Sequence, residues 1–348
     1  MKNPTILDKR YNFCEPVSSM ITYLQENYII IYIKKRVSFI SHQKKGNKMK
    51  LLVFDVGGTQ IKYAVAEDAL NLSEKGSVPT PSESFESFEK QISDIYLQCK
   101  DTVQGVAMSL PGPVDVKNGY IFNCGAMKYR HDKEVAKLLE ETCGCTVVLE
   151  NDGKAAALAE HRYGAIRDCS NAAVFLIGTG VGGGLIINNE LVRGIHFTAG
   201  EFSFINTEAD HYDDYGNILG NRCSTTFLLK RYHELSEDVE EIDGKEFFRR
   251  LEDDETAQRA LDELCTNIAV QILNLSCLLD LEKVAIGGGI SRQPILIDKI
   301  REKFEEVKQR SFTGRIGFKI HTQIVPCQFH NDANLIGAFI TFSEGEKQ

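Results

Sequence analysis

The sequence lacks the features expected of a membrane or secreted protein. None of its apolar stretches approaches the ~20 residues of a membrane span, and the longest, residues 28–33, is followed directly by three basic residues. The N-terminus has no charged start, apolar stretch and small-residue cleavage site in the order of a secretion signal. We therefore predict a cytoplasmic protein with no membrane partner.

Long basic runs and a spaced cysteine framework are missing as well. The formal net charge of −9 argues against a nucleic-acid partner. The ten cysteines are scattered, as expected for reduced thiols in the cytosol, and we interpret the CxC pair Cys143 and Cys145 as small buried residues. What is present is an ordinary globular composition, with 348 residues and 43% hydrophobic residues, enough for two domains.

The first 48 residues differ from the rest of the chain. They combine aromatic and basic residues without a core pattern and end in the string KKGNK before Met49. We expect residues 1–48 to be an N-terminal extension that is disordered or not part of the native protein, with Met49 as the natural start.

A unit of strand, glycine turn and strand occurs twice, about 120 residues apart. The first unit spans residues 50–67 and the second spans residues 172–188, where we expect the second strand to begin only at residue 185. Further strands are expected at 105–110, 146–149 and 283–286, and helices at 83–98, 133–142 (stopped by Gly144), 153–163, 256–279 and 333–342 (capped by Asn331 and Asp332). This order predicts an α/β protein with two similar lobes and a nucleotide between them.

Three glycine turns follow buried strands, and glycines let a phosphate approach the backbone closely. The first turn also offers the Asp55 carboxylate, which suits hydrated Mg²⁺; a plain hairpin explains that turn equally well. The second, residues 178–184, contains a GxGxxG string, but a strand follows it where a Rossmann fingerprint requires a helix. A phosphate cradle fits better there than a hairpin without a ligand. The third, residues 287–289, could support an adenine or ribose, although alone it is better explained as a tight turn.

Asp152 lies between a strand and an alanine-rich helix. A carboxylate at this position could accept the proton of a sugar hydroxyl during phosphoryl transfer. The helix dipole favours a negative charge at this end. The alternative is that Asp152 is only the N-cap of the helix.

Seven strings, taken together, resemble the ROK family of sugar kinases and repressors, in the superfamily that includes actin. In chain order they are DVGGTQIKYAV, SLPGPVD, ENDGKAAALAE, GTGVGGGLI, AGEF, IGGGIS and NDANLIGA. The resemblance covers residues 49–345 and implies an ATP- and Mg²⁺-dependent carbohydrate kinase. It implies a two-lobed, actin-like (ribonuclease H-like) α/β fold of mixed sheets flanked by helices. The small N-terminal lobe would hold residues 49–162 plus 331–346, and the large C-terminal lobe residues 163–330.

The resemblance also assigns roles to single residues. Asp152 would be the catalytic base, Asn151, Glu201 and Gly112 would bind the sugar, and Asp55 would hold Mg²⁺ through water. Nucleotide binding would fall to residues of the three turns: Asp55, Gly57, Gly58, Thr59, Gln60, Gly178, Thr179, Gly180, Gly182, Gly287, Gly288 and Gly289.

The chain departs from the family where kinases typically carry a histidine and a cysteine-rich zinc motif. Phe204 occupies the histidine position, and the following stretch offers only Cys223 and His211. These cannot complete a tetrahedral zinc site, so we predict no zinc and a core or exposed thiol at Cys223. Loss of these polar groups would open the anomeric end of the sugar site, as in β-glucoside kinases, which phosphorylate the 6-hydroxyl of the non-reducing glucose.

Other functions remain open at this point. Glucokinase, fructokinase and N-acetylmannosamine kinase are alternatives within the family. A sugar-responsive repressor would need an N-terminal helix-turn-helix, and residues 1–48 show no such helix pair. A catalytically silent sugar-binding protein is a third alternative. The resemblance also allows a homodimer.

Overall fold

The computed structural model describes residues 49–123, 131–236 and 240–345. The expected N-terminal extension, residues 1–48, lies outside the described residues. In the described part, no helix is both long enough and apolar enough to cross a membrane. Two five-stranded sheets, each with its own hydrophobic core, lie within the compact unit formed by residues 50–348.

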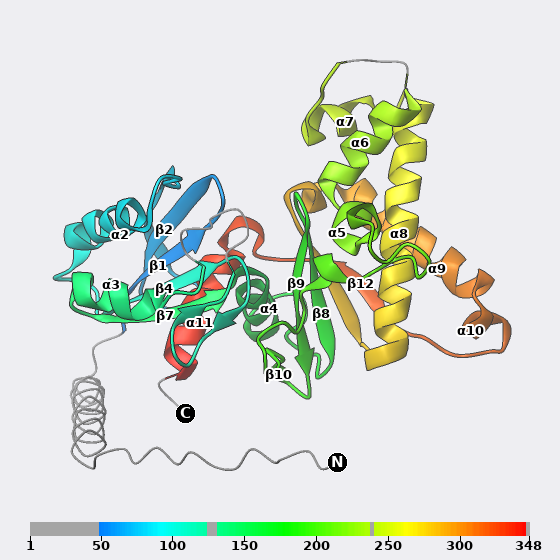
Figure 1. Cartoon of the computed structure of the whole chain (residues 1–348). Helices are drawn as coiled ribbons and strands as arrows, with labels where there is room; N and C mark the ends of the chain where they lie inside the picture. Colours follow the sequence, from blue (N-terminus) through cyan, green and yellow to red (C-terminus); the bar gives the residue numbers. More distant parts are fainter. Residues whose placement is uncertain (1–48, 124–130, 237–239, 346–348) are drawn as a thin grey trace, which may run out of the picture. The chain divides into compact units, whose positions relative to one another are not determined.

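The first sheet has the strand order β3–β2–β1–β4–β7 (Figure 1). The strands span Leu72–Pro79 (β3), Gln60–Ala66 (β2), Leu51–Val56 (β1), Gly105–Leu110 (β4) and Thr146–Asn151 (β7). Strand β1 pairs antiparallel with β2 and parallel with β4, which in turn pairs parallel with β7. This register places Lys62, Asp55, Ser109 and Glu150 in one row across the ends of the strands. The sheet is mixed, as predicted.

The second sheet, in the order β10–β9–β8–β11–β12, repeats this pattern of pairing (Figure 1). The strands span Glu190–Leu191 (β10), Val181–Ile187 (β9), Ala172–Ile177 (β8), Lys283–Gly288 (β11) and Gln323–Pro326 (β12). The duplicated hairpin is confirmed, but β9 begins four residues earlier than expected. Gly182, Gly183 and Gly184 pair with β8 inside the sheet rather than forming the turn. At Gly183 any larger residue would collide with the backbone oxygen of Val174, so a buried strand here needs glycine.

Helices flank both sheets. They span Phe85–Cys99 (α2), Val135–Cys143 (α3), Asp152–Arg162 (α4), Leu219–Arg222 (α5), Thr225–Leu235 (α6), Gly244–Arg250 (α7), Glu255–Leu279 (α8), Pro294–Arg310 (α9), Phe312–Arg315 (α10) and Ala333–Gly345 (α11). Short elements complete the described part: Val114–Asp115 (β5), Tyr120–Ile121 (β6), Phe202–Phe204 (η2), Tyr215–Asn217 (η3), Gly289–Arg292 (η4) and His330–Asp332 (η5). Helix α11 packs on β1, β4 and β7, and the long helix α8 packs on α6 and α9.

Of the two helix ends for which the sequence predicts a cap, one is confirmed and one is wrong. Helix α3 stops at Gly144, which takes the left-handed conformation (φ 73°) and donates its N–H to the Glu140 carbonyl, as predicted for a glycine cap. Before α11, Asn331 and Asp332 form a 3₁₀ turn rather than a simple cap. The Asp332 carboxylate instead accepts two hydrogen bonds of 2.9 Å from Lys75 Nζ.

Helix α4 joins the two sheets, because it packs against both α11 and β9. Its residues from Gly153 to His161 are all buried. Any side chain at Gly153 would overlap the backbone of Gly183, and any at Gly337 would overlap the carbonyl of Ala155. The alanine-rich sequence therefore reflects close helix packing on both sides, which fixes the position of the first residue of α4, Asp152.

Candidate active site

Asp152 begins α4 directly after β7. Its Oδ1 accepts hydrogen bonds from the backbone N–H of Gly153 (2.7 Å) and from Nδ2 of Asn151 (3.0 Å). Among the described residues no hydrogen bond reaches Oδ2, so this oxygen is available to a substrate hydroxyl. The N-cap role falls to Asn151, whose Oδ1 accepts from the backbone N–H of Lys154 at 3.0 Å. Asp152 is therefore not the helix cap.

The surroundings of Asp152 favour its protonated form. Burial raises the pKa of this carboxyl to about 6, the Gly153 N–H opposes the rise, and the negative charges of Asp55 and Glu201 add to it. The positive charge of Lys154 pulls the pKa down again. A carboxylate whose pKa lies just below neutrality is ionised at pH 7 yet more basic than an exposed aspartate, which suits a general base.

Asn151 links Asp152, the candidate base, to Gly112, another predicted sugar-binding residue. Its Nδ2 donates to the carbonyl oxygen of Gly112 at 3.0 Å as well as to Asp152. Gly112 follows β4 with φ 89°, a left-handed conformation that glycine adopts without strain. The structure thus brings Asn151, Asp152 and Gly112 together at the ends of two neighbouring parallel strands.

Glu201 reaches the same place from a different part of the chain. Its Oε1 lies 3.2 Å from Nζ of Lys154, whose side chain is only 2% exposed. A buried ammonium group is costly without a partner, so this ion pair fixes the direction of the Glu201 carboxylate. Glu201 keeps some exposure, at 22%, and its second oxygen can still meet a substrate.

Asp55 occupies the end of β1 and has three side-chain partners. Its Oδ1 accepts from Nδ2 of Asn334 (2.8 Å) and from Oγ of Ser109 (3.3 Å), and Oδ2 lies 3.4 Å from Nζ of Lys62. These partners come from α11, β4 and β2. They hold the carboxylate at the mouth of the first glycine turn, where Gly58 and Thr59 are exposed.

An ion pair between Arg193 and the buried Glu150 anchors the loop that carries Glu201. Glu150, which is 1% exposed, accepts two hydrogen bonds on Oε2 from the Arg193 guanidinium, at 3.0 and 2.6 Å. Thr341 of α11 also donates to this oxygen. Because Glu150 directly precedes Asn151 and Asp152, Arg193 links the loop of residues 192–201 to the base.

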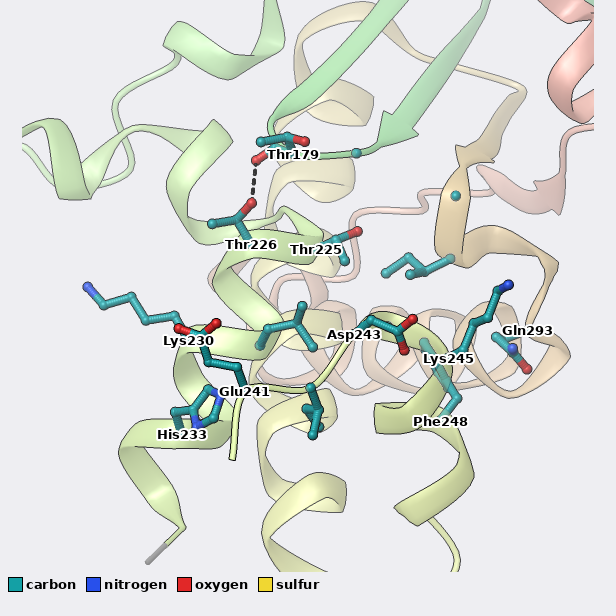
Figure 2. A pocket seen from close by; sticks show the side chains of 16 residues that line it. Thr179, Thr225, Thr226, Lys230, His233, Glu241, Asp243, Lys245, Phe248 and Gln293 are labelled. Carbon is teal, nitrogen blue, oxygen red and sulfur yellow. Dashed lines mark hydrogen bonds between the residues drawn. The ribbon is translucent and has the colours of Figure 1, made fainter. Parts of the chain in front are cut away.

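A pocket of about 670 Å³ lies beside the second glycine turn. Gly178, Thr179 and Gly289 line it, so residues from two of the three predicted turns meet there. Figure 2 shows Thr179 bonded to Thr226 at one end of the pocket and His233 and Phe248 at the other. The hydrogen bonds run from Thr225 N to the Gly178 carbonyl (2.9 Å) and from Thr226 Oγ1 to the Thr179 carbonyl (3.0 Å).

The remaining lining combines an apolar wall with polar groups. The wall residues are Leu229, Ile242, Phe248 and Ile290, and the polar ones are Lys230, His233, Glu241, Asp243, Lys245 and Gln293. The volume suits a nucleoside with its phosphates. Helix α6 starts at Thr225, but the N–H groups of Thr225 and Phe227 already donate to the Gly178 carbonyl and to Ser224 Oγ.

Known proteins were compared with the whole chain. The family model described as the ROK family matches residues 52–344. The chain belongs to the ROK family. The β-glucoside kinase of Listeria monocytogenes is 32% identical over 304 residues, covering 86% of this chain and 99% of that protein.

Two solved ROK structures share the fold. A ROK family protein from Streptococcus pneumoniae in complex with sucrose is 30% identical, with a TM-score of 0.76, covering 86% of this chain and all of the other. A ROK family glucokinase from Streptomyces griseus in complex with glucose and AMPPNP is 25% identical, with a TM-score of 0.73, covering 84% and 98%. The predicted actin-like α/β fold is confirmed, and so is the prediction of an ATP-dependent carbohydrate kinase.

Within this ROK kinase the predicted residues fall into two groups. Asp55, Gly112, Asn151, Asp152 and Glu201 are linked by hydrogen bonds, by the Lys154 ion pair or by electrostatic influence. Gly178, Thr179 and Gly289 line the pocket. The other predicted nucleotide-binding residues do not line it: Gly57, Gly58, Thr59, Gln60, Gly180, Gly182, Gly287 and Gly288.

Several of these glycines have a packing reason of their own. A side chain at Gly287 would lie 2.6 Å from Cδ2 of Leu176, and one at Gly288 (φ 95°) would overlap the Ile177 carbonyl. At Gly58, in contrast, nothing lies within 4 Å of the position a side chain would take. A phosphate needs open space beside an exposed turn. The geometry at Gly58 is therefore compatible with phosphate binding, which stays a prediction.

The sequence reasoning missed Lys154 and the pocket wall formed by α6 and α7. Lys154 lies within the ENDGKAAALAE string, two residues after the candidate base, and this position is the sequence signal that could have identified it. Ser224 and Asp243 cap α6 and α7 by accepting from backbone N–H groups. These cap residues were a local signal for the helices, but nothing in their spacing points to a shared pocket.

The two departures from the family pattern lie in different environments. Phe204 is 69% exposed, one turn of 3₁₀ helix after Glu201. Cys223 is fully buried in the core of the second sheet, and burial raises the pKa of its thiol to about 12. Of the two environments expected for Cys223, core or exposed, the structure shows the core, whereas the absence of zinc stays a prediction.

Proposed function

We propose that this kinase transfers the γ-phosphoryl group of MgATP to the 6-hydroxyl of glucose, free or as the non-reducing glucose of a β-glucoside. Oδ2 of Asp152 accepts the hydroxyl proton while the sugar oxygen bonds to phosphorus and the bond to ADP breaks. Positioning and charge stabilisation supply most of the rate, because the transition state is loose.

The observation that carries this proposal is the position of Asp152. Its carboxylate is held by two hydrogen bonds on one oxygen, leaves the other open, and has a pKa raised to about 6. It lies at a helix start that packing fixes on both sides. Burial of this carboxylate destabilises its charged form, and a role as proton acceptor explains why an aspartate is present at this position.

Asp55 is the residue we propose for Mg²⁺, through water. Mg²⁺ usually keeps several waters and binds nucleotide phosphates with one or two carboxylates. The described residues contain no cluster of three or more His, Cys, Asp or Glu side chains that could hold a metal by themselves. One carboxylate beside an exposed glycine turn fits a cation that arrives with the phosphates and neutralises their charge there.

Phe204 supports a substrate that extends beyond one sugar ring. The exposed ring of Phe204 stands where the family pattern has a polar side chain, so no polar group at this position would hold an anomeric hydroxyl. Relatives of this chain are named β-glucoside kinases, and one solved relative holds sucrose, a disaccharide. A glucose unit with a second group on its anomeric oxygen fits both observations.

The test is a coupled kinase assay with cellobiose, glucose, fructose and N-acetylmannosamine, comparing kcat/KM for each sugar. We expect cellobiose or glucose to lead. A strong preference for N-acetylmannosamine would refute the proposed substrate, and a preference for fructose would favour a fructokinase. If the protein consumes no ATP with any of these sugars, the result would favour a catalytically silent sugar-binding protein instead.

The remaining features of the proposal concern partners and location. The net charge of −9 argues against DNA binding, and retention of the full chain on DNA would favour a repressor. We expect a homodimer by resemblance, which light scattering would test, and a cytoplasmic location because of the scattered reduced thiols.

A further inference from the structure

Two phenylalanine rings from distant parts of the chain meet, and each belongs to a segment that leads to predicted sugar-binding residues. The rings of Phe122 and Phe197 are stacked, with centroids 5.9 Å apart and planes 22° apart. Phe122 follows β6, and Phe197 belongs to the loop between β10 and η2. Tyr120 supports the ring of Phe122 from its edge, at 5.0 Å and 66°. Phe122 nevertheless stays 42% exposed.

The segment of Phe122 is tied to the sugar site. Its backbone N–H donates to the carbonyl of Pro113 at 3.3 Å. Pro113 directly follows Gly112, whose carbonyl accepts from Asn151, the neighbour of the base. Two hydrogen bonds therefore connect the position of the Phe122 ring to Asp152.

The segment of Phe197 is tied to the same site from the other side. Arg193, at the start of this loop, pairs with the buried Glu150 just before Asn151 and Asp152. At its end, the N–H of Glu201 donates to the Thr198 carbonyl at 3.3 Å. The ring pair thus lies where the two segments that carry the candidate sugar-binding residues converge.

The backbone of Phe197 is strained. Its φ is 61°, in the left-handed region that bulky aromatic residues rarely adopt. Strain of this kind persists where the surrounding structure fixes it, and it concentrates at ligand clamps and active sites. A glycine would take this conformation without strain. The strain at Phe197 is therefore the cost of having an aromatic side chain at this position.

We propose that Phe122 and Phe197 form a subsite for the aglycone, the group on the anomeric oxygen of a β-glucoside. Aromatic rings and the C–H faces of an equatorially substituted pyranose are both apolar surfaces that stack on a phenylalanine. The partly exposed ring of Phe122 offers such a surface on a segment that is hydrogen-bonded to the turn carrying Gly112. This inference rests on the proposed function and names the part of the substrate that lies beyond the glucose.

Binding without ATP tests the subsite apart from catalysis. Isothermal titration would compare phenyl β-glucoside with methyl β-glucoside, which share the glucose and differ only in the aglycone. We expect wild type to bind the phenyl compound about 3- to 10-fold more tightly, the range that an aromatic stack contributes. Phe122→Ala should abolish this preference, while Phe122→Tyr, which retains the ring, should keep it.

Phe197→Gly is the second variant, because it removes the ring and also relieves the backbone strain. It should lose the phenyl preference with a melting temperature equal to or above that of wild type, which separates ligand binding from folding. Phe312→Ala serves as the matched control, since Phe312 is an exposed phenylalanine (68%) on α10. It should leave both affinities unchanged.

The outcomes separate the two proposals. A phenyl preference that Phe122→Ala abolishes supports the subsite even if no β-glucoside is phosphorylated, which would refute only the proposed substrate. Equal affinities of wild type for the phenyl and methyl compounds would overturn the subsite, even if both are phosphorylated. Loss of binding for both compounds in Phe122→Ala and Phe197→Gly would also overturn it, since it would show a structural role for the rings.

Discussion

Replacing Asp152 by asparagine should make this protein more stable and nearly inactive. The carboxylate is held in surroundings that raise its pKa from 3.8 to about 6, mainly through burial. The ionised form, which is the form proposed to act as the base, is therefore the form that the fold destabilises. Asparagine has a similar shape, stays neutral at every pH, and can accept the same two hydrogen bonds through its carbonyl oxygen.

The magnitude follows from the pKa of the folded and unfolded states. Between pH 3.8 and about 6 the folded protein keeps a proton on Asp152 that the unfolded chain has already lost. The free energy of unfolding must therefore fall as the pH rises through this window. Since one pKa unit corresponds to about 1.4 kcal/mol, the full loss by pH 7 amounts to about 3 kcal/mol. The asparagine variant has no ionisable group at this position, so its free energy of unfolding does not fall for this reason.

Urea denaturation of both proteins at pH 4.5 to 8 measures the effect. The stability advantage of Asp152→Asn should grow by about 2–3 kcal/mol across this range, while its kcat falls by ~10²–10⁴ at unchanged sugar affinity. Asp94→Asn, at an exposed position of α2, is the control and should show a difference of less than about 0.5 kcal/mol. An advantage that does not depend on pH would refute the burial argument, and near-normal turnover would refute Asp152 as the base.

Three further predictions test neighbouring parts of the site. Lys154→Met should raise the KM for the sugar about tenfold with a smaller effect on kcat, because Glu201 loses its charged partner; Lys154→Arg should recover part of the loss, and steady-state kinetics would show whether it does. Thr226→Val should raise the KM for ATP roughly threefold to tenfold and leave the KM for the sugar unchanged, since it removes the hydrogen bond to the second glycine turn; an unchanged KM for ATP would argue against the pocket as the nucleotide site. Gly153→Ala should lower the free energy of unfolding by about 2–3 kcal/mol in urea denaturation, because its methyl group would overlap the backbone of Gly183; a variant of wild-type stability would show that α4 can move.

The elements that the sequence predicts well are those with local causes. Strands β4 and β8 have the predicted bounds because each is a short, buried apolar run beside a glycine turn. The end of α3 is set by Gly144 alone. The resemblance to the ROK family supplied what these patterns could not, namely that the separate turns and carboxylates belong to one kinase.

The features that the sequence did not predict depend on contacts between distant segments. A lysine in an alanine-rich helix looks like a solvent-exposed charge, and only packing against α11 and β9 shows that Lys154 is buried. The start of β9 was placed too late because glycines are typical of turns, whereas here they pair with β8. The pocket wall combines α6 and α7 with the turns after β8 and β11. No local sequence pattern predicts that these segments lie together.

The two sheets share one strand pattern but differ in the side chain at one equivalent position. Asp55 in β1 and Leu176 in β8 hold equivalent positions, the fifth residue of each strand. Asp55 has Lys62 and Ser109 as its cross-strand neighbours, and both contact its carboxylate. Leu176 has Gly182 and Gly287 instead.

The glycines beside Leu176 make room for its side chain, which would otherwise meet a side chain at Gly287. The first hairpin therefore has a polar centre at Asp55, the residue proposed for Mg²⁺. In the second copy an apolar side chain fills the equivalent place, and the nearby turn lines the pocket. Two glycine turns that look alike in the sequence thus differ in structure: the first has a carboxylate with three side-chain partners beside it, and the second lines the pocket. Under the proposed function the first would meet the metal and phosphates and the second the rest of the nucleotide.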